Sequence, residues 1–87
     1  MRSFRLGREY KISFETSDNS PIREALSSLP DPTVAGSEWD AYSAQLEDGG
    51  IYFLDNLHGD SDAASIAFWL LIQAVLRCAE KVIVEEL

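Results

Sequence analysis

The chain has 87 residues, of which 15 are acidic and 7 are basic, and its formal net charge is −8. This length supports one domain with one core. A single cysteine, Cys78, excludes an internal disulfide and a cysteine-based metal cluster, and the negative charge opposes binding to nucleic-acid phosphates. We find no apolar run of secretory or membrane-spanning length, so we expect a cytoplasmic protein that does not associate with membranes.

Apolar and polar residues alternate near the N-terminus. This alternation predicts a strand with one buried face over 3–16, most clearly over 9–15. Gly7, beside the polar interruption at Arg8, indicates a bulge or a close approach of another backbone segment. The apolar positions of this strand are Phe4, Leu6, Tyr10, Ile12 and Phe14.

The next segment is a short helix that begins near residue 20. Ser20 can cap the helix, and Pro21 suits the first helical position, where a missing N–H costs nothing. Pro30 and Pro32 end the helix. The residues at helical spacing, which predict its buried face, are Ile22, Ala25, Leu26 and Leu29.

The segment 37–48 fits two structures. A capping-box pattern from Ser37 to Asp40 supports a helix. We favour a strand, because apolar residues also alternate over 42–46 and the following Asp-Gly-Gly is a hairpin-turn signal. A helix ending at Glu47 and Asp48 would also place two acids at its negative pole. The aromatic-rich segment 51–57 is then the second strand of the hairpin.

The stretch Ser61–Ala79 is the most apolar in the chain and predicts a long helix. Asp60 or Ser61 would cap this helix, with Asp62 in its first turn. At helical spacing one broad face is apolar, and this face is expected to meet the core. It collects Ala64, Ala67, Phe68, Leu71, Ile72, Val75, Cys78 and Ala79.

A second apolar stripe on this helix, Ile66, Trp69 and Leu70, lies where solvent is expected. Either the first helix or the loop at 30–34 covers the stripe, or it is a contact patch for a partner or a second copy.

The β-branched run at 82–84 predicts a final strand over Lys81–Glu86. The expected order is therefore β-α-β-β-α-β, an α+β, ferredoxin-like antiparallel sheet with two helices on one face. The alternative order is β-α-α-β-α, in which 37–48 is helical and the last helix runs to the C-terminus.

Catalytic and metal-binding patterns are not found. The one histidine, His58, is flanked by acids, but the spacing matches no metal site, and we interpret it as a loop residue before the long helix. No serine lies in a nucleophile motif. We therefore expect a protein that is not an enzyme and has no metal or cofactor.

Charge is unevenly distributed along the chain. No Lys or Arg occurs between Glu24 and Leu76, whereas nine acids do. Such a surface attracts basic proteins and speeds their association. The sequence therefore predicts a small acidic protein-binding module, namely an immunity-type inhibitor or acidic decoy that occupies a basic partner such as a nuclease toxin.

The residues expected to bind that partner are the acids Asp40, Glu47, Asp48, Asp55, Asp60 and Asp62, with Trp39 and Tyr52 as aromatic anchors. The alternative is a homo-oligomeric structural or regulatory module, for example a homodimer, that assembles through Ile66, Trp69 and Leu70 of the long helix.

Overall fold

The structure, a computed structural model, describes residues 7–57 and 61–87. Its strands form one antiparallel sheet in the order β2-β3-β1-β4. The predicted ferredoxin-like β-α-β-β-α-β order is confirmed, and the alternative with a helix over 37–48 is wrong. The elements are β1 (Arg8–Ser13), α1 (Ser20–Ser27), β2 (Tyr42–Glu47), β3 (Gly50–Asp55), α2 (Ala63–Cys78) and β4 (Ile83–Glu86).

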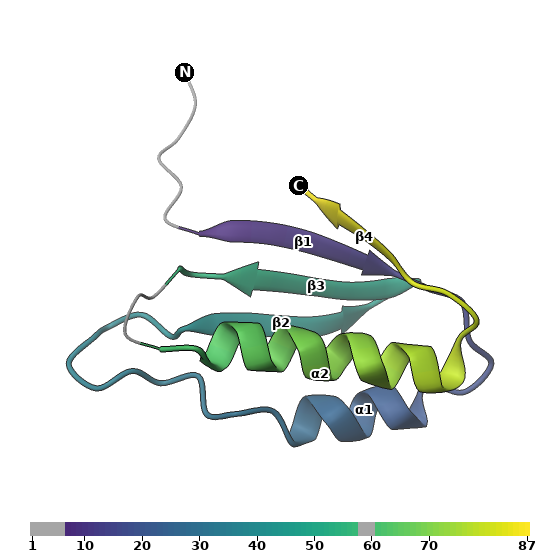
Figure 1. Cartoon of the computed structure of the whole chain (residues 1–87), viewed down its shortest axis with the longest axis horizontal. Coiled ribbons are helices and arrows are strands. Elements are labelled where there is room, and N and C mark those ends of the chain that lie inside the picture. Colours follow the sequence, from purple (N-terminus) through teal and green to yellow (C-terminus); the bar gives the residue numbers. More distant parts are fainter. Residues whose placement is uncertain (1–6, 58–60) are drawn as a thin grey trace.

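The two helices are displaced toward one edge of the sheet. Figure 1 shows α2 lying along the sheet and α1 beside α2, on the β2 side, whereas β4 forms the opposite edge with no helix next to it. α1 packs mainly against α2 and also touches β2. In the described part of the chain no helix is long and apolar enough to cross a membrane.

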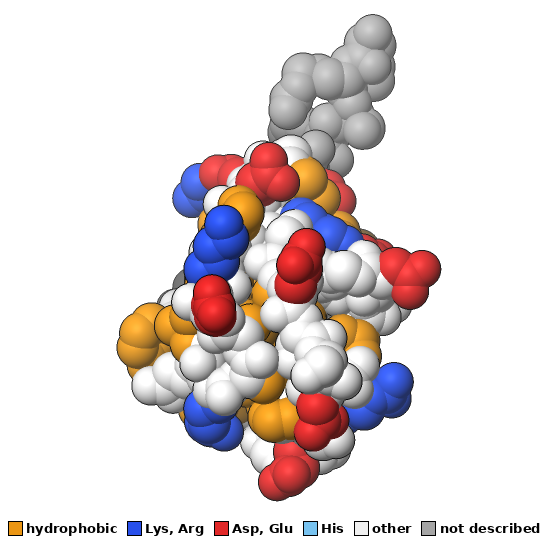
Figure 2. Space-filling view, turned by 90° about the vertical axis from the view of Figure 1, so that its right-hand side faces the viewer, with side chains coloured by type: hydrophobic (Ala, Val, Ile, Leu, Met, Phe, Trp, Pro, Cys, Tyr) orange, Lys and Arg blue, Asp and Glu red, His pale blue; other side chains and the backbone are white. Residues whose placement is uncertain are grey.

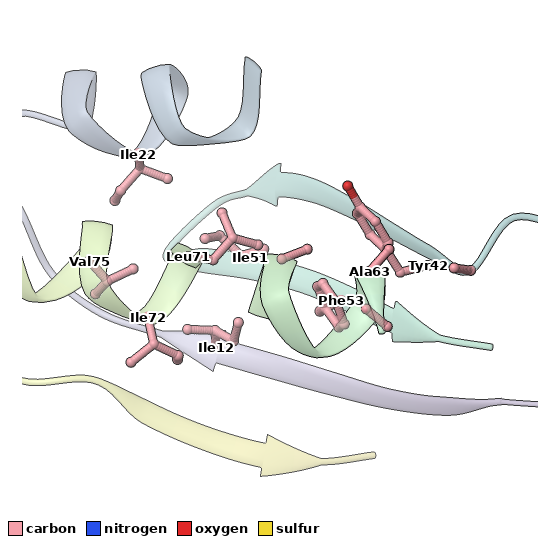
Figure 3. Close-up of a cluster of buried hydrophobic side chains, with 12 residues drawn as sticks. Ile12, Ile22, Tyr42, Ile51, Phe53, Ala63, Leu71, Ile72 and Val75 are labelled. Atoms are coloured by element: carbon pink, nitrogen blue, oxygen red, sulfur yellow. The ribbon is translucent and has the colours of Figure 1, made fainter. Parts of the chain in front are cut away.

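The core lies between the sheet and α2, where the alternating residues of the strands meet the broad apolar face of the helix. Figure 3 shows Ile12 of β1 facing Ile72 of α2, and Ile22 of α1 directed toward α2. Phe53 of β3 is 1 % exposed and lies at the centre of an aromatic group. Its ring stacks on Tyr42 at 5.6 Å between centroids and meets Phe68 edge-on at 5.2 Å.

β1 is shorter than the predicted strand over 3–16. Its first predicted residues lie outside the described part of the chain. At the other end the strand stops at Ser13, because the chain turns toward α1 and is held by Thr16, whose hydroxyl lies 2.9 Å from the carbonyl of Cys78. Gly7 confirms the expected close approach, since a Cβ there would lie 2.5 Å from the carbonyl oxygen of Asp55.

Both helices begin one or two residues away from the predicted caps. In α1 the cap position is Asn19, and Ser20 is the first helical residue. The Asp18 carboxylate accepts hydrogen bonds from the hydroxyl and the N–H of Ser20, at 2.6 and 3.0 Å, and these bonds lower the pKa of Asp18. In α2 the cap position is Asp62 rather than Ser61, and the alternative cap, Asp60, lies outside the described residues.

Candidate functional site

One end of the molecule gathers three segments that are far apart in the sequence. The start of β2, the end of β3 and the start of α2 lie together there (Figure 1). Asn56 joins the first two segments, because its backbone N–H donates to the carbonyl of Ala41 at 3.0 Å and its side-chain amide donates to the carbonyl of Asp40 at 2.7 Å. The residues on either side of Asn56 are therefore held against those that precede β2.

Two large apolar side chains project from this clamped region. Trp39 is 62 % exposed and Leu57 is 56 % exposed. Leu57 has a φ of 56°, in the left-handed region that non-glycine residues seldom occupy. The turn is stabilised by Asp55, whose carboxylate accepts a hydrogen bond from the N–H of Leu57 at 2.8 Å. Residues held in sparsely populated backbone regions cluster at functional sites.

Three carboxylates lie at the same end of the molecule, on the segments that meet there. Asp40 and Asp62 are exposed, and neither forms an ion pair with any of residues 7–57 and 61–87. Asp55 lies beside the start of α2, where it lines the same depression as Ala64. We call this surface the Trp39 end and define it by Trp39, Asp40, Asp55, Leu57 and Asp62.

The basic residue nearest to the Trp39 end in the sheet is already paired. Arg8 lies across β1–β3 from Asp55, but its guanidinium group makes a two-pronged contact with the carboxylate of Glu86, at 2.8 and 2.6 Å. This contact raises the pKa of Arg8, and the charge of Arg8 is offset by Glu86. The charge of Asp55 also contributes to this rise, so Arg8 interacts with both acids and most strongly with Glu86.

The remaining predicted acids do not lie at the Trp39 end. Glu47 and Asp48 belong to the β2–β3 hairpin at the opposite end of the sheet, and Glu47 accepts a hydrogen bond from Lys11 at 3.0 Å. Figure 2 looks onto this hairpin end, where acidic and basic side chains are interspersed. The structure thus brings together Trp39, Asp40, Asp55 and Asp62 but separates them from Glu47 and Asp48. His58 and Asp60 lie outside the described residues.

Tyr52, the second predicted anchor, lies on the sheet face that the helices leave open. It is half-buried, and its hydroxyl donates to the carboxylate of Glu9 at 2.7 Å. The neighbouring rings of Tyr10, Phe14 and Phe53 face the core instead. Tyr52 is therefore remote from both groups of acids and is engaged within the sheet.

The predicted apolar stripe on α2 is divided by α1. Leu70 is half-buried in a depression that it shares with Ala25 and Pro21 of α1. Ile66 and Trp69 stay 44 % and 58 % exposed. The first helix therefore covers one residue of the stripe and leaves the other two accessible.

Sequence reasoning missed Asn56 and Leu57 as parts of the site. Both lie within the strand that the sequence predicts over 51–57, because Leu57 continues its apolar character. The strand in fact ends at Asp55. The available signal was the Asp-Asn pair at 55–56, since both residues favour turns through side-chain bonds to nearby backbone.

Within the described ranges no three potential metal ligands converge. The features that distinguish the Trp39 end are therefore exposed apolar area and negative charge. No protein-family model matches the chain, and neither a curated protein nor a solved structure shows significant similarity to it.

Proposed function

We propose that this protein is a non-catalytic binding module whose Trp39 end docks on a basic surface of another protein. The observation that carries the proposal is the exposure of Trp39 and Leu57 next to the segments that Asn56 joins, at the end of the molecule that also holds Asp40 and Asp62. Neither of these two acids forms an ion pair with the described residues 7–57 and 61–87. Interfaces commonly combine a few aromatic or apolar anchors with a polar rim. The chain is therefore equipped for a partner rich in Lys and Arg.

Within this class we propose an immunity-type inhibitor or acidic decoy that occupies a cationic protein such as a nuclease toxin. The net charge of −8 on 87 residues supports fast capture of a cation-rich partner. Enzymes that act on nucleic acids need basic surfaces, and an acidic ligand competes for those surfaces. We place the module in the cytoplasm, where a lone cysteine such as Cys78 stays reduced.

The first experiment identifies the partner and measures its binding. The immobilised protein captures partners from a lysate of its source, and the captured protein is purified and titrated by calorimetry. We expect a basic protein whose affinity falls as NaCl is raised from about 50 mM to about 500 mM, because screening weakens exposed charge pairs. If the partner is a nuclease, its activity should fall to zero at equimolar inhibitor.

Paired variants then test which surface is used. Trp39→Ala should weaken binding by about thirtyfold, as loss of a central aromatic anchor does. The double change Asp40→Asn and Asp62→Asn should weaken binding by about tenfold, because it removes two charges that form no ion pair with the described part of the chain. The matched control, Glu47→Gln with Asp48→Asn, removes the same charge at the hairpin end and should have less than about a twofold effect.

Two results would contradict the proposal. One is a partner that is neutral or acidic and binds independently of salt. The other is an equal loss of affinity in both double variants, because net charge and not the Trp39 end would then determine binding.

A further inference from the structure

β4 is an edge strand whose outer side is open. All four of its residues are exposed, with Ile83 at 51 % and Val84 at 42 %. No helix lies beside it in Figure 1. Exposed edge strands with apolar residues can pair with further strands, and natural proteins usually cover or charge them. In β4 the charge of Glu85 and Glu86 lies in the second half of the strand, and Ile83 and Val84 form the apolar first half.

The other edge of the sheet is protected in a way that β4 is not. The residue before β2, Ala41, donates its N–H to the carbonyl of Pro32 at 2.7 Å. The hydroxyl of Tyr42 donates to the carbonyl of Pro30. The loop that contains these prolines, together with α1, thus lies against the start of β2. An added strand therefore has access to β4 and not to the start of β2.

The hydrogen bonds between β1 and β4 show which residues of β4 direct their backbone N–H and C=O groups toward β1. Leu87 donates its N–H to the carbonyl of Glu9 at 2.8 Å, so the odd-numbered residues of this segment bond to β1. The N–H and C=O groups of Val84 consequently point away from β1, toward the open side. Continuing the alternation one residue before β4 gives Val82 the same direction. These are the groups that an added strand would bond.

We propose that a second copy of this chain pairs its β4 antiparallel with β4 of the first, about a twofold axis that passes through Ile83 and stands perpendicular to the sheet. Such an axis keeps the helices of both copies on the same face, so an even-numbered residue must oppose an even-numbered one. Val82 then opposes Val84 of the second copy, and each such pair exchanges both N–H···O bonds. The result is one continuous sheet across the two copies.

Over residues 81–85 charge and hydrophobicity favour this register, whereas Glu80, which precedes this segment, faces Glu86 of the other copy. With the axis at Ile83, Lys81 opposes Glu85 of the other copy, on both sides of the axis. Shifting the axis to Val84 would place Ile83 opposite Glu85 and leave Lys81 opposite Leu87. Opposite charges across a strand pair are stabilising, whereas an acid facing an apolar side chain gains nothing. The first register is therefore the one that the sequence of β4 fits.

The helix-side face of β4 adds apolar contact in the same register. Val84 lines an open depression of about 360 Å³ whose apolar walls are Tyr10, Phe53, Ala64 and Phe68. Val82 and Val84 of the two copies would lie opposite each other and would continue the apolar lining of this depression across the twofold axis. The contact is small compared with obligate interfaces, so the dimer is expected to be weak and concentration-dependent.

Disulfide trapping tests the position of the axis. In a Cys78→Ala background, Ile83→Cys puts two thiols in a directly opposed pair, where Cα atoms lie about 4.5 Å apart and a disulfide can form. The matched control, Val84→Cys, puts the two thiols about two residues out of register, beyond disulfide reach. Under mild oxidation we expect at least about fivefold more crosslinked dimer from Ile83→Cys. Equal crosslinking by both variants, or none by Ile83→Cys, would overturn the register.

Charge exchange tests the pairing without a crosslink. By sedimentation velocity, Lys81→Glu and Glu85→Lys should each be monomeric, because each places like charges opposite one another. An equimolar mixture of the two should form a heterodimer, and the double exchange in one chain should restore the homodimer. Loss of dimer that neither the mixture nor the double exchange recovers would overturn the proposal.

Assembly through α2 is the competing outcome. It predicts that Trp69→Ala abolishes the dimer while the Lys81 and Glu85 variants retain it, and this result would overturn pairing through β4. A wild-type protein that stays monomeric at millimolar concentration would also overturn pairing through β4. Neither result bears on the Trp39 end, because Ile83 lies opposite Ser13, where β1 ends, whereas the Trp39 end lies where β1 begins.

Discussion

Phe53→Ala is expected to destabilise the domain by about 3–5 kcal/mol, the usual cost of deleting a buried aromatic ring. Phe53 is 1 % exposed in β3, one of the two interior strands, and its ring contacts those of Tyr42 and Phe68. A chain of 87 residues has a total stability of about 4–13 kcal/mol. The variant should therefore be partly or fully unfolded near physiological temperature.

Urea denaturation followed by circular dichroism measures this effect. Trp39→Ala is the control, because it removes a still larger ring from a side chain that is 62 % exposed, and its effect should stay within about 0.5 kcal/mol. Phe53→Leu keeps much of the volume and should fall between the two. A loss for Phe53→Ala no greater than that for Trp39→Ala would show that the Tyr42–Phe53–Phe68 group is not the centre of the core.

Gly50→Ala is expected to cost about 3 kcal/mol, at the upper end of overpacking effects. A Cβ at Gly50 would lie 2.2 Å from the carbonyl oxygen of Ile12, in the backbone of the neighbouring strand. Backbone cannot move aside as a flexible side chain can, so β1 and β3 would have to separate at this point. Their pairing there, Ser13 with Gly50, is the last of the β1–β3 register.

The adjacent Gly49 supplies the control. It has a φ of 74°, but a Cβ there would meet no atom within 4 Å. Gly49→Ala should therefore cost only the conformational penalty of about 1–2 kcal/mol. Denaturation midpoints of the two variants give the comparison, and a larger loss for Gly49→Ala would mean that turn conformation outweighs the contact between the strands.

Much of the fold was predictable because two periodicities are strong in this chain. The alternation around Tyr10, Ile12 and Phe14 identified β1 and its buried face, and the Asp-Gly-Gly turn identified the hairpin. Gly7 was recognised as a point of close approach because it interrupts a strand. The close approach at Gly50 was not predictable from the sequence. The turn alone explains the pair Gly49 and Gly50, and the sequence does not show which strand lies beside Gly50.

The candidate site was less predictable because it depends on which strand ends meet. The acids between Glu24 and Leu76 form one uninterrupted run along the chain, yet the hairpin places Glu47 and Asp48 at one end of the sheet and Asp40 and Asp55 at the other. Helix caps were misplaced by one or two residues because Ser, Asp and Asn are similarly good caps. Leu57 is predicted as part of the strand, because nothing in the sequence indicates the positive φ of an apolar residue that follows a strand.

The position of β1 between β3 and β4 also bears on how the chain folds. The hairpin of β2 and β3 closes a loop of a few residues, whereas Arg8 and Glu86, which join β1 to β4, are 78 positions apart. The entropy lost on closing a loop grows with its length, so the β1–β4 pairing carries the highest entropic cost in the sheet. Local structure can thus build the hairpin and the helices early, but β1 gains its second neighbour only when the segments around residues 8 and 86 meet. This is the slow, non-local kind of step that separates mixed α/β domains from fast-folding helical bundles.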